Sequence, residues 1–442
     1  MLPPTSWMTS KPLIIDLSAP HGKAVPSINS LIPHDDFSLH YHSVDGAVQL
    51  IKEAGPHCQL AKADITSAFK VMPLNPAFWH LFGVRWHGKL YFAVRLTFGC
   101  RSSPKIFDTL SESLCWILQN NYDIKLLVHL LDDFLVVTPT SQPPASGITT
   151  LSEVFKKLGI PLSPEKTEGP STRLEFLGII LDTEEFAMAL PKEKKDRISV
   201  IIETFLIEPS HSKQELLSLL GHLNFAMRVI PQGRPFIAHL LSAASAVPSL
   251  SDTVHIDAHG LADLRLWKLF LDEWNGLCLF YNDCVLSPED LQLFTDAAPS
   301  VGFGGYYNGR WFASTWPQAF LRGCADAPSS AVFELYPIVL AAIVWGKEWR
   351  TRSVLIHSDN EAVVNAINST RTKSQTVSPY LRRLVWTAAS CQFIIRAAHI
   401  PGHHNQIADS LSRFQFQKFR SLAPDADALP TRLPRFSETI FP

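Results

Sequence analysis

The stretch LLDDFLVV, residues 130–137, places two adjacent aspartates, Asp132 and Asp133, directly before a run of apolar, β-branched residues. A second apolar run, KLLVHL (125–130), precedes the pair, so two strands joined by a short turn are expected. Burying an unpaired carboxylate is costly, so adjacent aspartates at a strand end need compensation. A plain hairpin turn is the alternative interpretation, because Asp is a good turn former.

A third apolar run, LAKADI (60–65), carries Asp64 near its end. If this strand neighbours the other two, Asp64 joins Asp132 and Asp133 in one cluster of carboxylate oxygens. Mg²⁺ prefers such hard ligands and keeps several waters for a phosphate partner. Two ions held in this way can activate an attacking 3′-hydroxyl and stabilise a departing pyrophosphate. The pattern therefore predicts a two-metal site for nucleotidyl transfer.

A second set of acidic residues is spread over the C-terminal part of the chain. Its members are Asp296 in LFTDAAP, Glu334 in VFELYP, Asp359 in HSDNEAVV and Asp409 in NQIADSLSR. Most of them adjoin strongly apolar segments, where a charge is expensive without a metal or partner. Converging on one sheet edge, they would form a second two-metal site, with bound water as the nucleophile of a hydrolysis. The alternative is an inactive α/β domain that keeps these residues for turns and caps.

Pro337 follows Glu334 by three residues. Proline breaks a helix interior but is tolerated in a first turn. Glu334 is therefore expected near the start of its helix, where the helix dipole lowers the cost of its charge.

Length and composition bound the class of protein. At ~150 residues per domain, 442 residues suggest about three domains. With 46% hydrophobic and 18% charged residues, the chain can bury sizeable cores, which excludes global disorder. A net charge of −2 excludes a histone-like polycation. Residues 371–442 contain more basic than acidic residues. This excess is compatible with phosphate binding, but also with an ordinary solvated surface.

The seven cysteines are scattered without a CxxC pair, which favours a reducing, intracellular setting and disfavours a structural zinc module. The apolar runs look too short for the ~20 residues of a membrane-spanning helix. The N-terminal MLPPTSWMTSKP does not resemble a signal peptide. We therefore expect an intracellular protein without a membrane partner.

The remaining pattern predicts the organisation of the chain. Residues 103–121 have helical spacing, and 140–147 have the composition of a loop. Residues 191–241 become helical, with a capping box from Ser212 to Glu215. The small, polar segment 242–253 is the best linker candidate, and another amphipathic helix follows it. From about 290 onward, strands followed by alternating helices and strands predict a compact α/β domain.

In this order the segments resemble the fingers and palm of reverse transcriptases, specifically those of tyrosine-recombinase retrotransposons, the DIRS group. KPLIIDLSAPHGKAVPSIN is similar to the fingers motif, ADITSAF and LLDDFL to the two catalytic motifs, and TFGCRSSPKIF to the motif that contacts template and nucleotide. GIPLSPEKTEG and LEFLGIIL resemble the motifs that close the palm. In the C-terminal part, TDAA, HSDN and HIPGHHNQIADSLSR resemble a retroelement RNase H domain. The resemblance covers roughly residues 11–420.

For the palm, the resemblance implies that Asp64, Asp132 and Asp133 are catalytic metal ligands. It also makes Lys166 the residue that protonates the leaving pyrophosphate, unless it is a solvated loop lysine. The nucleotide-binding residues implied are Phe69 as a steric gate against the ribose 2′-OH, Phe98 and Gly99 in the nucleotide pocket, and Lys11 on the triphosphate. A core aromatic is the alternative for Phe69. Leu130 stands where the family usually has Tyr or Phe, which affects the positioning of the primer end.

For the RNase H part, the resemblance makes Asp296, Glu334, Asp359 and Asp409 the catalytic metal ligands. His403 best matches the mobile histidine that assists product release, with His399 and His404 as competitors. Asn405 would order the loop rather than bind metal. A zinc site through His399 and His403 is the rival interpretation, although no cysteine lies in register to complete it.

The implied fold class is α+β and α/β multidomain: a reverse-transcriptase fingers and palm with a helical thumb, followed by an RNase H-like mixed-sheet domain. The expected segments are fingers and palm (1–185, truncated at its N-terminus), thumb (186–245), linker or connection (246–288), RNase H-like domain (289–415) and an irregular tail (416–442). The implied activity is RNA-directed DNA synthesis with RNase H cleavage, using two Mg²⁺ or Mn²⁺ ions per site.

The implied partners are an RNA template, a DNA primer, the RNA–DNA hybrid and dNTPs, and the sequence does not indicate an oligomeric state. An enzyme in which only the nuclease works, and an inactive nucleic-acid-binding relic, are the alternative functions.

Overall fold

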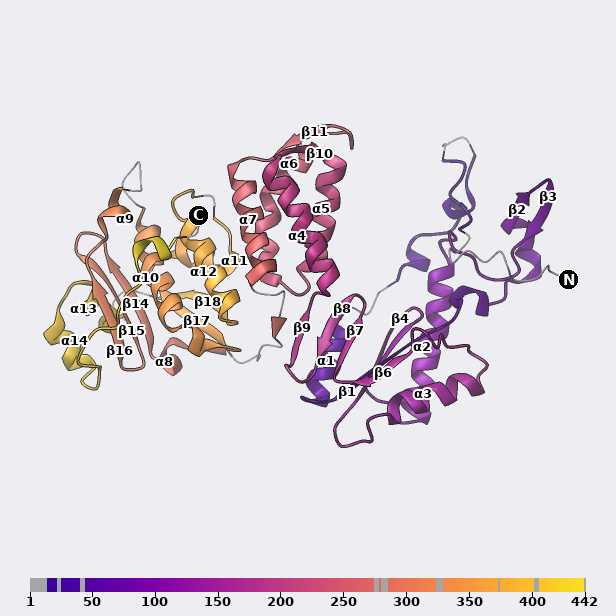
Figure 1. Ribbon diagram of the computed structural model, residues 1–442, viewed down its shortest axis with the longest axis horizontal. Helices are drawn as coiled ribbons and strands as arrows, with labels where there is room; N and C mark the ends of the chain where they lie inside the picture. The colour runs from indigo at the N-terminus through magenta and orange to yellow at the C-terminus, as the bar shows by residue number, and fades with distance from the viewer. Residues whose placement is uncertain are drawn as a thin grey trace. The chain divides into compact units, whose positions relative to one another are not determined.

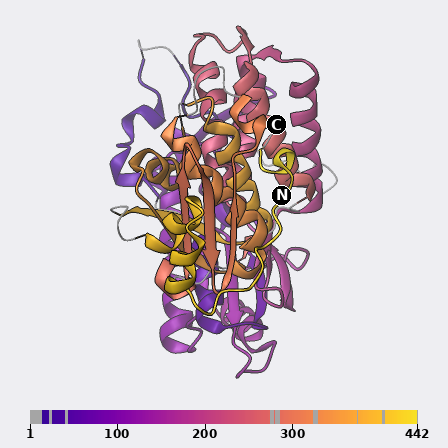
Figure 2. The same ribbon diagram turned by 90° about the vertical axis from the view of Figure 1, so that its left-hand side faces the viewer.

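The structure is a computed structural model, drawn in Figures 1 and 2. It describes residues 14–21, 25–39, 44–273, 278–279, 285–322, 329–372, 374–400 and 405–440. The chain divides into two compact units, Met1–Phe186 and Ala187–Pro442. Each unit has its own buried core.

The first unit is built on an antiparallel sheet of four strands in the order β4-β5-β1-β6. Its strands are β1 (Gln59–Asp64), β4 (Leu127–Leu130), β5 (Asp133–Thr138) and β6 (Glu168–Ser171). The first three match the predicted apolar runs, whose buried side chains give each strand a face to pack. β1 therefore lies between two neighbours, with its C-terminal end at Asp64.

Three α-helices of this unit are α1 (Val44–Ala54), α2 (Ser103–Asn121) and α3 (Ser146–Lys157). α2 has the bounds predicted from its apolar spacing. α3 starts inside the predicted loop 140–147, so that loop is shorter than its composition suggested. Phe107 of α2, Phe134 of β5 and Phe155 of α3 are fully buried in one core between helices and sheet.

The other elements of the first unit are short. They are η1 (Ile28–Leu31), η2 (Asp35–Phe37), η3 (Ala68–Val71), η4 (Pro76–Phe82), β2 (Gly83–Trp86) and β3 (Lys89–Phe92). β2 and β3 form an antiparallel hairpin. β3 covers only part of the apolar run GKLYFAVRL, whose later residues form no regular strand.

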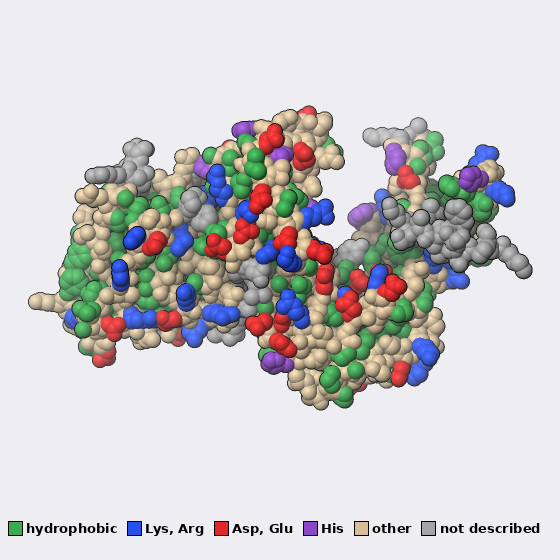
Figure 3. All heavy atoms as spheres, viewed as in Figure 1, with side chains coloured by type: hydrophobic (Ala, Val, Ile, Leu, Met, Phe, Trp, Pro, Cys, Tyr) green, Lys and Arg blue, Asp and Glu red, His purple; other side chains and the backbone are tan. Residues whose placement is uncertain are grey.

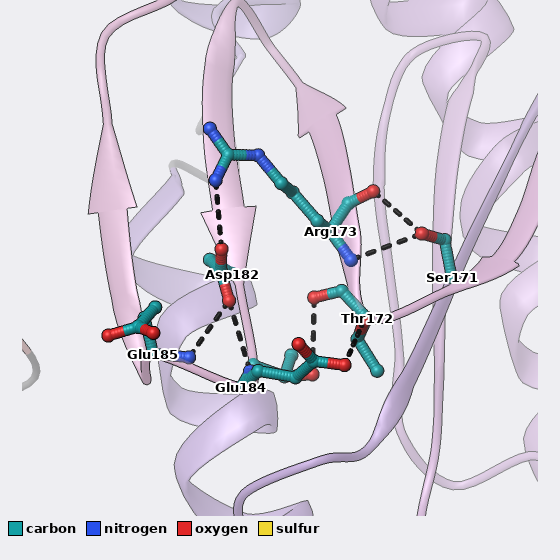
Figure 4. Close-up of polar contacts among 7 residues, drawn as sticks. Ser171, Thr172, Arg173, Asp182, Glu184 and Glu185 are labelled. Atoms are coloured by element: carbon teal, nitrogen blue, oxygen red, sulfur yellow. Dashed lines mark hydrogen bonds and ion pairs between the residues drawn. The ribbon is translucent and has the colours of Figure 1, made fainter.

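A hairpin of β7 (Arg173–Phe176) and β8 (Ile179–Asp182) ends the first unit in a polar network (Figure 4). Arg173 and Asp182 are cross-strand partners, and Arg173 Nη1 lies 3.1 Å from Asp182 Oδ2. The other carboxylate oxygen of Asp182 accepts hydrogen bonds from the backbone N–H groups of Glu184 and Glu185, at 3.1 and 2.9 Å. One side chain thus closes both the hairpin end and the turn that follows it.

The first part of the second unit is a helical bundle with short strands before, between and after its helices. Its elements are β9 (Ala187–Ala189), α4 (Lys192–Ile207), β10 (Ser210–Ser212), α5 (Lys213–Ala226), η5 (Pro231–Ile237), α6 (Ala238–Ser245), β11 (Thr253–His255), α7 (Ala258–Glu273) and β12 (Cys278–Leu279). The capping box of Ser212 and Glu215 is present at the start of α5, as predicted. The linker prediction needs correction, because α6 extends into 242–253 and α7 packs against α4 as part of the bundle.

The rest of the second unit is a mixed α/β domain. Strands β14 (Leu293–Ala298), β15 (Gly302–Tyr307) and β16 (Arg310–Ser314) form an antiparallel sheet. Strands β13 (Val285–Leu286), β17 (Ser353–Ser358) and β18 (Ile394–His399) form a parallel sheet, and β14 contacts β17. The other elements are α8 (Pro288–Leu291), α9 (Gln318–Arg322), α10 (Ser330–Trp345), η6 (Gly346–Trp349), α11 (Glu361–Ser369), α12 (Ser378–Ser390), α13 (Gln406–Ser412), α14 (Phe416–Leu422) and η8 (Phe436–Glu438).

Helices cover both faces of the antiparallel sheet, with α13 and α14 on one side and α10 on the other (Figure 1). Every residue of β15 is buried as a result. The fold class predicted from the sequence, α+β and α/β with an RNase H-like mixed-sheet domain, is confirmed.

Three details differ from expectation. Pro337 lies in the interior of α10 rather than in its first turn, because burial on nearly every face of this helix outweighs the lost hydrogen bond. The tail is not wholly irregular, since α14 forms within it. Among the described residues one segment, Ser330–Trp349, is long and apolar enough to cross a membrane, although 72% of its apolar 18-residue window is buried inside the protein, as in a core helix.

Candidate active sites

The two aspartates of LLDDFLVV lie at the tight turn between β4 and β5. Leu130 and Asp133 are cross-strand partners, so Leu131 and Asp132 are the two turn residues. Leu131 has a φ of +54°, a left-handed conformation that is rare for a bulky residue and typical of functional sites. A hydrogen bond joins the turn to the end of β1: Ile65 N, in the residue after the strand, donates to the carbonyl oxygen of Asp132 at 3.1 Å.

The turn brings the predicted carboxylates together. Asp64 and Asp133 are direct partners at the end of the antiparallel pair β1–β5. Asp132 is the next residue in the turn, and Asp64 is only 6% exposed. The plain-turn alternative does not account for a third carboxylate held at the same edge of the sheet.

Backbone hydrogen bonds hold the segment that carries Lys166 next to this cluster. Ser163 N donates to the carbonyl oxygen of Asp64 at 2.8 Å, and Lys166 N donates to the carbonyl oxygen of Ser163 at 3.3 Å. The side chain of Lys166 is 65% exposed, yet its Nζ lies 3.0 Å from Asp64 Oδ2. The structure therefore places it at the acidic cluster rather than free in a solvated loop.

Two carboxylates of the cluster, Asp132 and Asp133, have raised pKa values. Burial is the main cause at both residues. The pKa of Asp133 rises to about 6, because the neighbouring Asp132 and Asp64 add to the effect of burial. The ammonium of Lys166 opposes the rise at both residues, and the pKa of Lys166 is itself raised by its hydrogen bond to Asp64. Such a site is short of positive charge, which favours binding of a cation.

The predicted nucleotide-pocket residues lie together next to η3. The ring of Phe69 is 8% exposed and lies 4.8 Å from the ring of Phe98, measured between centroids. Phe69 also packs on Phe107 at 5.7 Å, so it is both a core aromatic and a neighbour of the exposed Phe98. Lys11 lies outside the described residues.

Gly99 has a role that the sequence analysis did not anticipate. Its φ is +95°, and a Cβ atom there would lie 1.9 Å from the backbone oxygen of Ile15. The close approach that requires a glycine is therefore to the chain's own segment at Ile15, which is also hydrogen-bonded to Phe98.

The second acidic set converges at one end of the β14–β17 region. Asp296 lies in β14, Glu334 in α10, Asp359 directly after β17 and Asp409 in α13. Burial raises the pKa of Glu334 to about 9, with contributions from the charges of Asp296 and Asp359. Burial likewise raises the pKa of Asp296 to about 6, with Asp409 and Asp359 contributing. The carboxylates are therefore close enough to repel one another.

Hydrogen bonds between elements hold this end of the domain. Asn360 Nδ2 donates to Ser330 Oγ at 3.0 Å, which joins the starts of α11 and α10. Asn405 Nδ2 donates to the carbonyl oxygen of Thr295 at 2.7 Å, which joins the start of α13 to β14 next to Asp296.

Two polar neighbours of the carboxylates were missed in the sequence analysis. Ser412 Oγ lies 2.6 Å from Asp296 Oδ2, and Arg413 Nε donates to Asp409 Oδ1 at 2.6 Å. Their signal was available, because positions three and four residues after Asp409 share its face of a helix.

Of the three candidate histidines, the structure describes only His399. His399 ends β18, is exposed, and pairs with Ser358, the residue before Asp359. His403 and His404 lie outside the described residues, and with them the zinc alternative.

The donor chemistry of both clusters suits Mg²⁺ or Mn²⁺, which prefer carboxylate oxygens. Within the described ranges, no three His, Cys, Asp or Glu side chains already surround a single point at ligand distance. A basic side chain instead contacts one carboxylate in each cluster, Lys166 at Asp64 and Arg413 at Asp409. On the face drawn in Figure 3, Lys and Arg side chains lie among Asp and Glu side chains.

Comparison with known proteins gives a consistent relationship. Residues 22–181 match the family model "Reverse transcriptase (RNA-dependent DNA polymerase)". The chain is 25% identical over 217 residues to the Gag-Pro-Pol polyprotein of human T-cell leukemia virus 3, covering 48% of this chain and 14% of that protein. It is 23% identical over 414 residues to Polyprotein P3 of Commelina yellow mottle virus, covering 89% of this chain and 20% of that protein.

Protein P of duck hepatitis B virus is 23% identical over 240 residues, covering 54% of this chain and 29% of that protein. The chain thus spans less than a third of the length of these relatives. Among solved structures, the foamy viral protease-reverse transcriptase dRH in complex with double-stranded DNA matches with a TM-score of 0.49 and 17% identity, covering 85% of this chain and 61% of that one. Residues 22–181 are therefore similar to the reverse transcriptase family, and the chain as a whole is similar to parts of retroviral and pararetroviral proteins.

Proposed function

We propose that the protein is an RNA-directed DNA polymerase with RNase H activity. The observation that carries the first activity is the pairing of Asp64 with Asp133 across β1–β5, with Asp132 in the adjoining turn and Lys166 at Asp64. Two divalent cations on these carboxylates would supply Lewis-acid chemistry for in-line nucleotidyl transfer. The chain's own part is to fix the carboxylates at a sheet edge and to hold a proton at Lys166 Nζ for the leaving group.

The second activity rests on the convergence of Asp296, Glu334 and Asp359. Burial raises the pKa of Glu334, and the charges of Asp296 and Asp359 add to that rise. A site that gathers negative charge at a domain edge suits binding of divalent cations and hydrolysis of a phosphodiester. The substrate proposed is RNA paired with DNA, held mainly through phosphate contacts that are independent of sequence. A solved relative, the foamy viral protease-reverse transcriptase, has been obtained in complex with an RNA/DNA hybrid.

The element of origin is proposed to be a DIRS-group retrotransposon, on the strength of the motif strings around Asp64, Asp132 and Asp409. A gene for a tyrosine recombinase next to this reading frame in genomic DNA would support that origin. A retroviral-type integrase gene in that position would contradict it.

Two assays with matched variants test the enzyme assignment. Primer extension on an RNA template should be lost in Asp132→Asn and retained in the control Asp123→Asn, which changes an exposed surface carboxylate. Cleavage of an RNA–DNA hybrid should be lost in Asp359→Asn and retained in Asp425→Asn. Both activities should require Mg²⁺ or Mn²⁺ and stop on addition of a chelator.

The alternative functions give other patterns in the same assays. An enzyme with only a working nuclease would cleave the hybrid but never extend a primer. An inactive relic would bind the hybrid and show neither activity.

A further inference from the structure

The end of α13 lies unusually close to the sheet beneath it. A Cβ atom on Gly304 of β15 would lie 2.4 Å from Leu411 Cβ and 2.9 Å from Ser412 N. Only a glycine leaves room for the helix at that point. This close docking buries Ser412 completely and brings its side chain to the neighbouring strand β14.

Ser412 contacts two of the clustered residues at once. Its Oγ lies 2.6 Å from Asp296 Oδ2 and 3.0 Å from the carbonyl oxygen of Asp409. A hydroxyl has one proton to donate, and the shorter contact to an ionised carboxylate is the stronger of the two. The hydroxyl therefore fixes the orientation of the Asp296 carboxylate through one of its oxygens.

Arg413, the next residue, contacts another carboxylate of the cluster, that of Asp409. Its Nε lies 2.6 Å from Asp409 Oδ1, and Lys418 Nζ lies 3.9 Å from the other oxygen. The positive charge of Arg413 also lowers the pKa of Asp296. Since its side chain is 51% exposed, Arg413 can leave Asp409 without opening the core.

We propose that Ser412 and Arg413 are positioning residues of the proposed nuclease site with opposite effects on a divalent cation. Ser412 presents the Asp296 carboxylate to the ion. Arg413 neutralises Asp409 while the site holds no ion, and the entering ion displaces it. The proposal rests on the nuclease function proposed above. In it, Ser412 supports the metal site and Arg413 competes with the metal ion for Asp409.

The expected effects follow from these roles. Loss of a residue that orients a metal ligand weakens metal affinity by about 10-fold or more. Loss of a competing charged hydrogen bond should strengthen affinity by up to about 10-fold. A residue that merely stabilised the fold would weaken binding or leave it unchanged when removed, so an increase in affinity identifies competition.

Mn²⁺ binding to the full-length protein, followed by electron paramagnetic resonance of free Mn²⁺, provides the test. All variants carry Asp132→Asn and Asp133→Asn, so that the palm cluster contributes little. Ser412→Ala should raise the Mn²⁺ dissociation constant, Ser412→Thr should restore it, and Arg413→Gln should lower it. Hybrid cleavage at limiting Mn²⁺ should change in the same directions.

Two matched controls separate these effects from general ones. Ser410→Ala removes another fully buried hydroxyl from α13, one that donates to the carbonyl oxygen of Ile407. Lys418→Gln removes a nearby positive charge that lies 3.9 Å from Asp409. Both should leave the dissociation constant within about twofold of the parent, and thermal unfolding checks that every variant is folded.

The outcomes are distinguishable. If Ser412→Ala and Arg413→Gln shift the affinity in the same direction, or do not shift it while the parent binds Mn²⁺ and cleaves the hybrid, the positioning proposal is overturned and the nuclease stands. If the parent and Asp359→Asn give identical Mn²⁺ isotherms and neither cleaves the hybrid, the nuclease function itself is overturned, and this proposal with it.

Discussion

Asp64 and Asp133 face each other as the last pair of the β1–β5 ladder, one on a central strand and one at the start of a hairpin arm. Directly opposed residues of an antiparallel pair have Cα atoms about 4.5–5.5 Å apart, so two like charges there repel strongly. The fold holds them together because β1 is also paired on its other side with β6. This arrangement stores unfavourable electrostatic energy that a bound cation would relieve.

Lys166 is the protein's own cation at this place, and its removal should affect both chemistry and titration. In Lys166→Gln we expect primer extension to slow by about 100-fold, because a positioned proton donor typically contributes 10²–10⁴. The acid limb of the pH–rate profile should move to higher pH, since Lys166 lowers the pKa values of Asp132 and Asp133. Single-turnover extension between pH 5.5 and 8.5 measures both effects. The control Lys70→Gln changes an exposed lysine of η3. Equal rates in the two variants would contradict the assigned role.

Phe69 should determine the choice between deoxyribonucleotides and ribonucleotides. Its ring lies against the exposed Phe98 at the predicted nucleotide pocket. In Phe69→Leu we expect incorporation of ribonucleotides, relative to deoxyribonucleotides, to rise by about tenfold, because a shorter side chain leaves space for a 2′-OH. Competition assays with paired nucleotides measure this ratio. Phe107→Leu, in the same core but fully buried, should lower stability without changing the ratio.

Glu334 predicts a pH dependence of stability in metal-free solution. Its pKa rises from 4.5 to about 9 on folding, so between these values the folded protein retains a proton that the unfolded chain releases. The free energy of unfolding should therefore fall as pH increases through this range, by at most about 1.4 kcal/mol per unit. Glu334→Gln should remove this contribution and stabilise the protein at pH 8.

Urea unfolding at pH 6, 7 and 8 with a chelator present measures that slope. Glu348→Gln is the matched control, because Arg310 lowers the pKa of Glu348 and its contribution is already complete above pH 5. If the wild-type and Glu334→Gln proteins have parallel stability profiles, Glu334 does not carry the proton.

A buried ion pair joins the helical bundle to the α/β domain within the second unit. Arg382 of α12 donates to Asp263 Oδ1 of α7 through Nη2 at 2.7 Å and Nε at 3.2 Å, and His239 Nδ1 lies 2.6 Å from the other oxygen. The side chains of Asp263 and Arg382 are 2% and 8% exposed. Arg382→Met should therefore destabilise the unit by about 3–5 kcal/mol, because it leaves the buried Asp263 carboxylate without its guanidinium partner.

The double variant Arg382→Met/Asp263→Leu should recover most of that loss, because it removes both charges. Denaturant unfolding of the single and double variants measures the coupling. Additive losses would show that the two side chains do not act as a pair.

The sequence was most informative where local pattern and burial agree. The apolar spacing of 103–121 predicted α2 because no internal residue opposes the helix, and Ser212 with Glu215 predicted the cap of α5. Asp64, Asp132 and Asp133 could be grouped because each ends or begins an apolar run that forms a strand. Tertiary packing determined the rest. Pro337 lies inside α10 because burial of the helix outweighs the lost hydrogen bond. Gly99 has a positive φ where the chain passes close to the backbone of Ile15, and no local sequence pattern reveals that contact.

The order β4-β5-β1-β6 also has a consequence for synthesis on the ribosome. The strand made first, β1, occupies the middle of the sheet, and its partners appear about seventy and a hundred residues later. Until Ser171 has left the exit tunnel, the edge of β1 that pairs with β6 stays unpaired. The Asp64 carboxylate also stays without its contact to Lys166 until that part of the chain has folded. Nascent chains that stop short of that point should therefore depend on chaperones, because late pairing of distant strands leaves an early one exposed to aggregation.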